Sequence, residues 1–230
     1  MSGGLTPSPR PRIWVNCAIS LDGRLALDRG ARAQLSGPED LERVQRLRAD
    51  ADGILIGVGT AVLDDPSLRV HWELLGRPAG RPPTRIVLDS RGRLPANARV
   101  LDGSQPTIVA VSEASTRTYP AHVDRLVAGK DRVELPRLFE ALAARHMDRV
   151  MVEGGAEVLA SVLSSGLFDR LTVYVAPLLI GDRGAPPLVA APAVHRLEDA
   201  YPLTLLAVDR LGSGFVASYA PGRRPSLDAR

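Results

Sequence analysis

Residues 53–60, which read G-I-L-I-G-V-G-T, contain the pattern that decides the fold class. Gly53 opens a short apolar run at residues 54–58, which predicts a β-strand buried on both faces. Thr60 is placed to cap the helical turn that follows, and the Asp-Asp-Pro at residues 64–66 ends that turn. A buried strand that passes directly into a helix is the unit from which parallel α/β sheets are built.

Similar elements follow on both sides of this segment. Short apolar runs predict strands at residues 13–20, 85–89, 107–111, 149–152 and 171–176. Start signals and helical spacing predict helices from residue 38 to about residue 48, at 136–146 and at 156–164. Two late runs, at residues 204–208 and 215–219, predict a terminal hairpin. We therefore expect a three-layer α/β fold: a mostly parallel mixed sheet with helices on both faces and a C-terminal antiparallel hairpin.

The composition excludes several classes of protein. The 230 residues are 45% hydrophobic and 24% charged, which excludes collagen, coiled coils and wholesale disorder. The net charge of +3 is spread along the chain without a basic tract, so we expect no nucleic-acid partner. The single cysteine, Cys17, excludes an internal disulfide framework and fits a cytoplasmic location. No apolar run approaches the ~18 residues that span a bilayer, so no membrane partner is expected.

The chain has one candidate domain, at residues 12–220, without an internal repeat. Residues 1–11 are rich in Gly, Pro, Ser and Thr and lack the apolar segment of a secretory signal, so they predict a disordered leader. Residues 221–230 predict a disordered tail.

Polar and glycine residues follow four of the expected strands. Ligands of open α/β sheets bind beyond the carboxyl ends of the strands, which makes these segments the candidate site. They are residues 20–23, 57–60, 89–91 and 153–155. The two glycines after Glu153 either let a phosphate approach the N–H groups that open a helix, or serve only a tight turn. Ser90 and Arg91 either hold an adenosine 2′-phosphate or form an ordinary polar strand end.

Other candidate motifs are weaker. Residues 57–60 lack the third glycine of a dinucleotide fingerprint and the Lys of a phosphate-binding loop. Asp64 and Asp65 are adjacent, so their carboxylates seldom point at one atom, and a solvated helix end is favoured over a metal pair or an acid/base dyad. The four histidines have no ligand spacing, and no metal site is expected.

Four motifs together resemble the pyrimidine reductases of riboflavin biosynthesis. They are N-C-A-I-S-L-D-G-R at 16–24, G-V-G-T-A-V-L-D-D-P-S-L at 57–68, R-I-V-L-D-S at 85–90 and E-G-G-A-E-V-L at 153–159. They occur in the family's order and span most of residues 12–220. The resemblance implies a dihydrofolate-reductase-like fold, NADPH as hydride donor and usually a homodimer. The implied reaction opens and reduces the ribosyl group of a phosphoribosylaminopyrimidine to ribityl. A zinc deaminase domain, fused to many bacterial members, is missing, so we expect a stand-alone reductase.

The resemblance also assigns cofactor positions. It places the cofactor against residues matching Ala18, Thr60, Asp64 and Ser90, with Arg91 beside the last of these. It places the cofactor phosphates on the turn that opens the helix after Glu153, which contains Gly154, Gly155, Ala156, Glu157, Val158 and Leu159.

The substrate positions follow in the same way. Arg48 and Glu153 match substrate-binding residues, with Arg48 expected on the 5-phosphate. His71 stands where the family has a second phosphate-binding Arg, so either Arg69 or His71 is expected to replace it. Asp65 and Glu153 are the candidates for the proton donor of the reduction.

Asn16 bears on the choice of substrate. Bacterial bifunctional members tend to carry Lys here, whereas Asn resembles the stand-alone archaeal and fungal type, which reduces the diaminopyrimidinone before deamination. The deaminated 5-amino-6-ribosylamino-uracil 5′-phosphate stays an alternative substrate. Two further alternatives are a pterin or dihydrofolate reductase, disfavoured by only three Phe and two Trp, and a non-catalytic nucleotide-binding homologue, which the departure at His71 leaves open.

Overall fold

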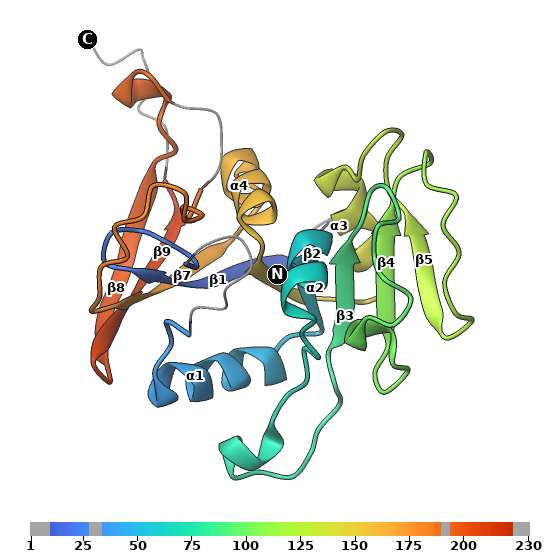
Figure 1. Ribbon diagram of the computed structural model, residues 1–230, viewed down its shortest axis with the longest axis horizontal. Coiled ribbons are helices and arrows are strands. Elements are labelled where there is room, and N and C mark those ends of the chain that lie inside the picture. Colours follow the sequence, from blue (N-terminus) through green and yellow to red (C-terminus); the bar gives the residue numbers. More distant parts are fainter. Residues whose placement is uncertain (1–9, 28–33, 190–193, 223–230) are drawn as a thin grey trace, which may run out of the picture.

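The protein is described here from a computed structural model, which describes residues 10–27, 34–189 and 194–222. Its centre is a nine-stranded sheet with the order β5-β4-β3-β2-β6-β1-β7-β9-β8 (Figure 1). The strands are β1 Arg12–Ser20, β2 Gly53–Gly57, β3 Thr84–Leu88, β4 Thr107–Val111, β5 Val123–Val127, β6 Arg149–Gly154, β7 Arg170–Ala176, β8 Leu203–Leu211 and β9 Gly214–Pro221. Strands β1 to β7 pair in parallel, and the hairpin β8-β9 joins β7 antiparallel. The expected mixed sheet is confirmed.

Helices cover both faces of the sheet, as expected. They are α1 Pro38–Ala49, α2 Val58–Asp64, α3 Leu135–Ala143 and α4 Ala156–Ser165, with short 3₁₀ turns η1 Trp72–Leu75, η2 Arg99–Leu101 and η3 Leu197–Asp199. Figure 1 shows α1 and α4 on opposite sides of β1 and β7. On the α3–α4 face, Phe139 and Val162 belong to the larger apolar core. On the α2 face, Ala61 packs in a second core with Val87 and Val109.

The structure corrects three expectations about local elements. The third helix ends at Ala143, because His146 adopts a left-handed φ of 59° and the turn brings Met147 into the core. The segment at residues 71–83, whose Gly-, Pro- and Arg-rich composition predicts a loop, contains the turn η1. Strand β5 was not predicted, since its V-D-R-L-V sequence buries only Val123 and Leu126 at the edge of the sheet.

The expected leader and tail fall mostly outside the described residues. Within the described part, Arg10 already pairs with Asp169 at 2.7 Å, and β9 includes Pro221. No helix in the described ranges is long and apolar enough to cross a membrane.

Candidate active site

A cleft of about 1980 Å³ lies at the carboxyl ends of β1, β2, β3 and β6. All the residues expected to contact the cofactor line this cleft, and Glu153 lines it too. They are Ala18, Thr60, Asp64, Ser90, Arg91, Gly154, Gly155, Ala156, Glu157, Val158 and Leu159. Residues up to 141 positions apart in the chain meet here because the parallel strands end at the same edge of the sheet.

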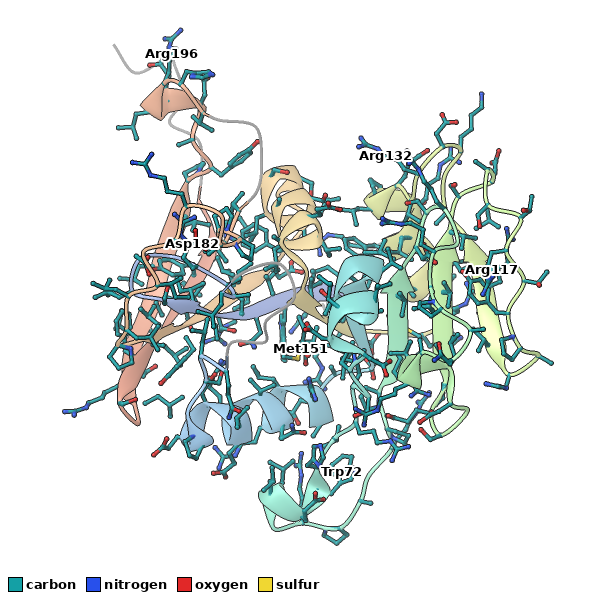
Figure 2. The ribbon with its side chains drawn as sticks, viewed as in Figure 1. Trp72, Arg117, Arg132, Met151, Asp182 and Arg196 are labelled. Atoms are coloured by element: carbon teal, nitrogen blue, oxygen red, sulfur yellow. The ribbon has the colours of Figure 1, made fainter. Side chains whose placement is uncertain are left out.

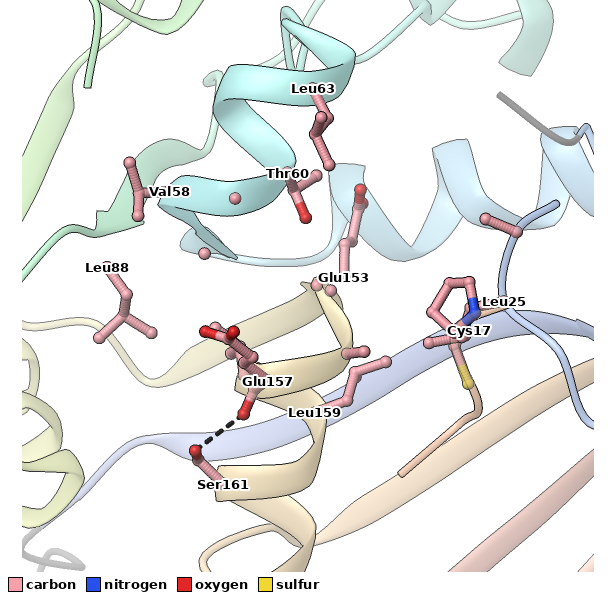
Figure 3. A pocket seen from close by; sticks show the side chains of 18 of the residues that line it. Cys17, Leu25, Val58, Thr60, Leu63, Leu88, Glu153, Glu157, Leu159 and Ser161 are labelled. Carbon is pink, nitrogen blue, oxygen red and sulfur yellow. Dashed lines mark hydrogen bonds between the residues drawn. The ribbon is translucent and has the colours of Figure 1, made fainter. Parts of the chain in front are cut away.

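Two glycine turns form the middle of the cleft. Gly154 and Gly155 have φ values of 142° and 80°, in the region that favours glycine. A Cβ on Gly155 would lie 2.9 Å from Thr60 Oγ1, and one on Gly57 would lie 2.7 Å from Val158 Cγ2. The glycines therefore let the β2–α2 and β6–α4 turns pack against each other, and they leave the first turn of α4 open toward the cleft (Figure 3).

The structure also corrects the expected role of Thr60. Helix α2 begins after Gly57, and no side chain caps it. Thr60 lies inside this helix with its side chain toward the cleft (Figure 3). Its hydroxyl is thus positioned for a ligand rather than for a helix cap.

Glu153 and Arg48 form a bidentate ion pair in the site. Arg48 Nε and Nη2 each donate to one carboxylate oxygen of Glu153, both at 2.6 Å. Arg48 Nη1 donates to the backbone carbonyl of Arg69 at 3.1 Å. Burial alone would lower the pKa of Arg48, but the charge and hydrogen bonds of Glu153 outweigh it and raise that pKa above its ordinary value. Arg48 is therefore a permanent cation that holds Glu153 in place.

The other candidate proton donor lies away from the cleft. Asp65 ends α2 in a left-handed conformation with φ 40°, and its Oδ1 accepts a hydrogen bond from the Arg99 backbone N–H at 2.7 Å. Asp64 lines the cleft, so the two adjacent carboxylates point apart. Of the two candidates, only Glu153 lines the cleft.

Arg69 and His71 are not brought to the cleft either. Arg69 Nη2 donates to Asp102 Oδ2 at 2.9 Å, and His71 Nδ1 lies 3.0 Å from Glu73 Oε1. The side chains of Arg69 and His71 are both about half exposed. Neither side chain lines the cleft, and the guanidinium fork of Arg48 is itself occupied by Glu153.

Asn16 faces a second, smaller cavity of about 310 Å³ beneath α1. Its Oδ1 accepts hydrogen bonds from Arg43 Nη2 at 2.8 Å and Thr172 Oγ1 at 2.9 Å. Met151, which also lines this cavity, lies between α1 and the central strands (Figure 2). The structure therefore separates Asn16 from the cleft that Ala18 lines two residues later.

Sequence reasoning missed part of the cleft wall. Arg93 and Arg132 line the same end as Ser90 and Arg91, and the segment 183–187 closes another side. Figure 2 shows Arg132 on the loop before α3. Arg132 is a single basic residue in a polar loop and gives no pattern to search for. Arg93, three positions after Ser90, could have been indicated by its place in the same strand end.

Cys17 lines the cleft but is not an activated nucleophile. Burial raises the pKa of its thiol to about 12; the Arg43 charge opposes this shift and that of Asp40 adds to it. The thiol is thus protonated at neutral pH. Within the described ranges no group of three or more His, Cys, Asp or Glu side chains could hold a metal ion.

Comparison with known proteins gives four consistent matches. The model of the RibD C-terminal domain matches residues 11–217. The 2,5-diamino-6-ribosylamino-4(3H)-pyrimidinone 5′-phosphate reductase of Methanothermobacter thermautotrophicus is 37% identical over 214 residues, which is 91% of this chain and 98% of that protein. The Archaeoglobus fulgidus protein of the same name is 35% identical over 218 residues, covering 91% and 97%. Among solved structures, Acinetobacter baumannii RibD superposes with a TM-score of 0.81 at 26% identity, over 94% of this chain and 59% of that one.

Proposed function

This chain belongs to the RibD C-terminal domain family, and we propose that it is a reductase that converts the ribosyl group of a phosphoribosylaminopyrimidine to ribityl in riboflavin biosynthesis. The observation that carries the proposal is the long cleft, in which Glu153, paired with Arg48, lies beside the open first turn of α4. Such a cleft has room for a dinucleotide and a second ligand together.

The residues of the cleft fit a nicotinamide nucleotide. The positive φ of Gly154 and the open space around its Cβ position leave the N–H groups of the first turn of α4 accessible to a pyrophosphate. Thr60 lies near Glu153 in the cleft (Figure 3), where the nicotinamide would lie, and Ala18 lines the same cleft. When bound, this cofactor supplies a hydride. The side chains of the protein bind and orient the substrate.

We further propose that the cofactor is NADPH. Arg91, Arg93 and Arg132 line the Ser90 end of the cleft, and none of them forms an ion pair with an acidic residue in the described part of the chain. Guanidinium groups that lack acidic partners suit the additional 2′-phosphate that distinguishes NADPH from NADH.

The chemistry asked of the protein is to stabilise and orient the substrate. The opened ribosylamine is an imine, which accepts a hydride more readily when its nitrogen is protonated and cationic. Glu153, fixed by Arg48 with both oxygens hydrogen-bonded, presents a negative charge toward the cleft at a defined position. Its role is thus electrostatic. The nitrogen keeps its proton in the cationic imine, and the oxygen released by ring opening takes up a proton from water.

We propose 2,5-diamino-6-ribosylamino-4(3H)-pyrimidinone 5′-phosphate as the substrate. Two archaeal relatives of nearly the same length carry this activity in their names. The deaminated uracil derivative is the alternative. A pterin is disfavoured because Tyr201 is the only aromatic residue among the described residues that line the cleft. The departure at His71 does not weaken the case for catalysis, since His71 lies outside the cleft.

Two further properties are proposed. Strand β8 forms an edge of the sheet and exposes Leu203, Leu205, Leu206 and Val208, so we propose that a second copy covers it in a homodimer. Light scattering that returns the 24.6 kDa monomer mass at micromolar concentration would exclude this dimer. The single, reduced Cys17 supports the prediction of a cytoplasmic location.

The direct test is oxidation of NADPH, followed by its near-ultraviolet absorbance, with each of the two pyrimidine phosphates. We expect turnover with the diaminopyrimidinone and less with its deaminated counterpart. If the protein binds NADPH but reduces neither compound, the fold and cofactor assignments stand and the substrate assignment fails.

A further inference from the structure

The segment at residues 178–188, called the strap below, follows β7 and closes one side of the cleft. Its residues 183–187 line the cleft. The strap lies against the loop that follows β1, and the Leu21 N–H donates to the Leu178 carbonyl at 2.8 Å. That loop contains the S-L-D-G-R sequence at residues 20–24, to which the proposed function gives no role. The loop after β1 and this side of the cleft therefore form one structure.

Asp22 fixes the first half of the strap. Its Oδ1 accepts the backbone N–H of Ile180 at 3.0 Å, and its Oδ2 accepts that of Gly181 at 2.8 Å. Ser20 Oγ also donates to Asp22 Oδ1. The hydrogen bond from Ser20, followed by those from the two strap N–H groups, holds the pKa of Asp22 well below its ordinary value. Asp22 is therefore an anion at neutral pH whose two oxygens are both used to anchor the strap.

Hydrogen bonds to backbone carbonyls fix the second half of the strap. The Leu25 N–H donates to the Pro186 carbonyl at 2.8 Å, and Arg24 Nη1 donates to the Ala185 carbonyl at 3.1 Å. Ala185 is only 1% exposed, so this anchor packs against the body of the protein. Both halves of the strap are thus held by the loop after β1, and the apex at residues 182–184 lies between the two anchors.

The apex presents Arg183 to the cleft. Arg183 lines the cleft and forms no ion pair with an acidic residue in the described part of the chain. The neighbouring carboxylate, Asp182, accepts the backbone N–H of Gly184 through Oδ1 at 2.7 Å, which closes the apex turn. A guanidinium group on an anchored turn, with no acidic side chain to neutralise it, suits a phosphate that enters the cleft.

Arg183 lies on the opposite side of the cleft from the arginines proposed to bind the 2′-phosphate. Those arginines lie at the Ser90 end, beyond β3, whereas the strap follows β7. In the sheet order β3-β2-β6-β1-β7, these two strands are four spacings apart, which is about 19 Å. Figure 2 shows Arg132 and Asp182, the neighbour of Arg183, on opposite sides of α4. One phosphate does not reach both sides, so the cleft has two separate cationic ends.

The proposed reaction brings one more phosphate to the cleft than the cofactor sites hold. The 2′-phosphate and the pyrophosphate of the cofactor are assigned to the β3 side and to α4, which leaves the 5′-phosphate of the substrate. The fork of Arg48 is occupied by Glu153, and neither Arg69 nor His71 lines the cleft. Glu153 lies at the end of β6, two strand spacings or about 10 Å from β7. A substrate whose sugar lies at Glu153 can therefore extend its phosphate to Arg183.

Resting on the proposed function, we infer that Arg183 binds the 5′-phosphate of the substrate and that Asp22 is a positioning residue that holds the strap so that Arg183 faces the cleft. Arg183 thus takes the role that the sequence analysis expected of Arg69 or His71. The S-L-D-G-R sequence serves substrate binding through the strap and does not itself contact the substrate.

The first test is Arg183→Gln, which removes the charge of an exposed side chain and leaves the anchors of the strap intact. We expect KM for the pyrimidine phosphate to rise about tenfold or more, with the dissociation constant for NADPH changed less than about twofold. Arg46→Gln, on the exposed face of α1, is the matched control and should keep the wild-type KM. A wild-type KM in Arg183→Gln, or a loss of NADPH affinity in its place, overturns the assignment.

The role of Asp22 is tested by Asp22→Asn, alone and combined with Arg183→Gln. The amide keeps one acceptor oxygen and sets its NH₂ group against one of the two strap N–H groups, so the apex loses its fixed position. We expect KM to rise about threefold or more in Asp22→Asn, and the double variant to have the KM of Arg183→Gln alone. Effects of the two substitutions that multiply would show that Asp22 does not act through Arg183.

A binding measurement separates this inference from the proposed function. Calorimetry with ribose 5-phosphate, which carries the sugar and phosphate without the ring, is done with saturating NADPH so that the cofactor sites are filled. The wild-type protein and Arg46→Gln should bind this probe equally, and Arg183→Gln should bind it about tenfold more weakly or worse. If the wild-type protein reduces neither pyrimidine phosphate, the proposed function fails while this comparison still decides whether Arg183 binds a sugar phosphate. No binding of the probe to the wild-type protein, or equal binding to Arg183→Gln, overturns the inference.

Discussion

Removing Arg48 alone from the Glu153–Arg48 pair should cost more stability than removing both partners. The side chains of these residues are 12% and 17% exposed and share two hydrogen bonds of 2.6 Å. Arg48→Met leaves an unpaired carboxylate in this site and breaks the bond to the Arg69 carbonyl, for an expected loss of about 3–5 kcal/mol. Glu153→Gln keeps one acceptor for Arg48 and should cost about 1.5–3 kcal/mol. The double variant leaves no buried charge at this point, and we expect it to lose about 1–3 kcal/mol.

The assay is urea unfolding of the wild-type protein and the three variants at pH 7, followed by circular dichroism. A double-mutant cycle built from these values should give a coupling energy of at least about 2 kcal/mol. Losses that add within about 0.5 kcal/mol would refute the reasoning, because they would show that the two charges do not depend on each other in the folded protein.

The same variants test the electrostatic role of Glu153 in catalysis. If Glu153 supplies a fixed charge, Glu153→Gln lowers kcat by about 10- to 100-fold and leaves the shape of the pH–rate profile unchanged. If Glu153 donated the proton, the variant would lose one limb of that profile, which would refute the role proposed here.

Three further predictions concern the cofactor and the core. Gly155→Asp should weaken NADPH binding at least tenfold, measured by fluorescence titration, because it adds bulk and negative charge at the first turn of α4; Gly166→Asp, which has a similar φ of 68° at the other end of that helix, should not. Arg91→Gln combined with Arg132→Gln should lower the preference for NADPH over NADH about tenfold or more in steady-state kinetics, and an unchanged preference would exclude a 2′-phosphate at this end of the cleft. The raised pKa of Cys17 predicts a contribution to stability that is complete below pH 9.0 and is lost as the pH rises toward about 12. The free energy of unfolding should therefore fall less steeply over this range in Cys17→Ala, and parallel slopes would count against the buried thiol.

Many of the residues that line the cleft could be predicted from the sequence, because the ends of buried strands are recognisable. A short apolar run predicts a buried strand, and parallel strands bring their carboxyl ends to one edge of the sheet. Thr60, Ser90 and Gly155 were therefore expected at the cleft, and the structure places them there. The four motifs that suggested the family lie on or beside these strand ends, and the comparisons confirm that resemblance.

Some residues that the sequence analysis expected at the site lie elsewhere in the structure, and the reasons are local. Asp65 turns away because the chain ends α2 in a left-handed conformation, which no residue pattern at this point indicated. Arg69 and His71 face Asp102 and Glu73, so their side chains are directed by partners that the motif does not contain. The Arg69–Asp102 contact joins residues 33 positions apart and depends on tertiary packing, which a single sequence does not display.

In helix α1, charged and polar side chains with hydrogen-bond partners contribute more to the site than the apolar residues at helical spacing. The spacing of its leucines and valine located the helix, yet its fully buried residues are Asp40 and Gln45. Burying such groups contributes less to stability than an apolar stripe would, and it is tolerated only when each group is hydrogen-bonded. Here the same helix supplies Arg43 to Asn16 and Arg48 to Glu153. One helix thus orients a group on each of two neighbouring strands, so its polar packing holds Glu153 in the site at the expense of the core.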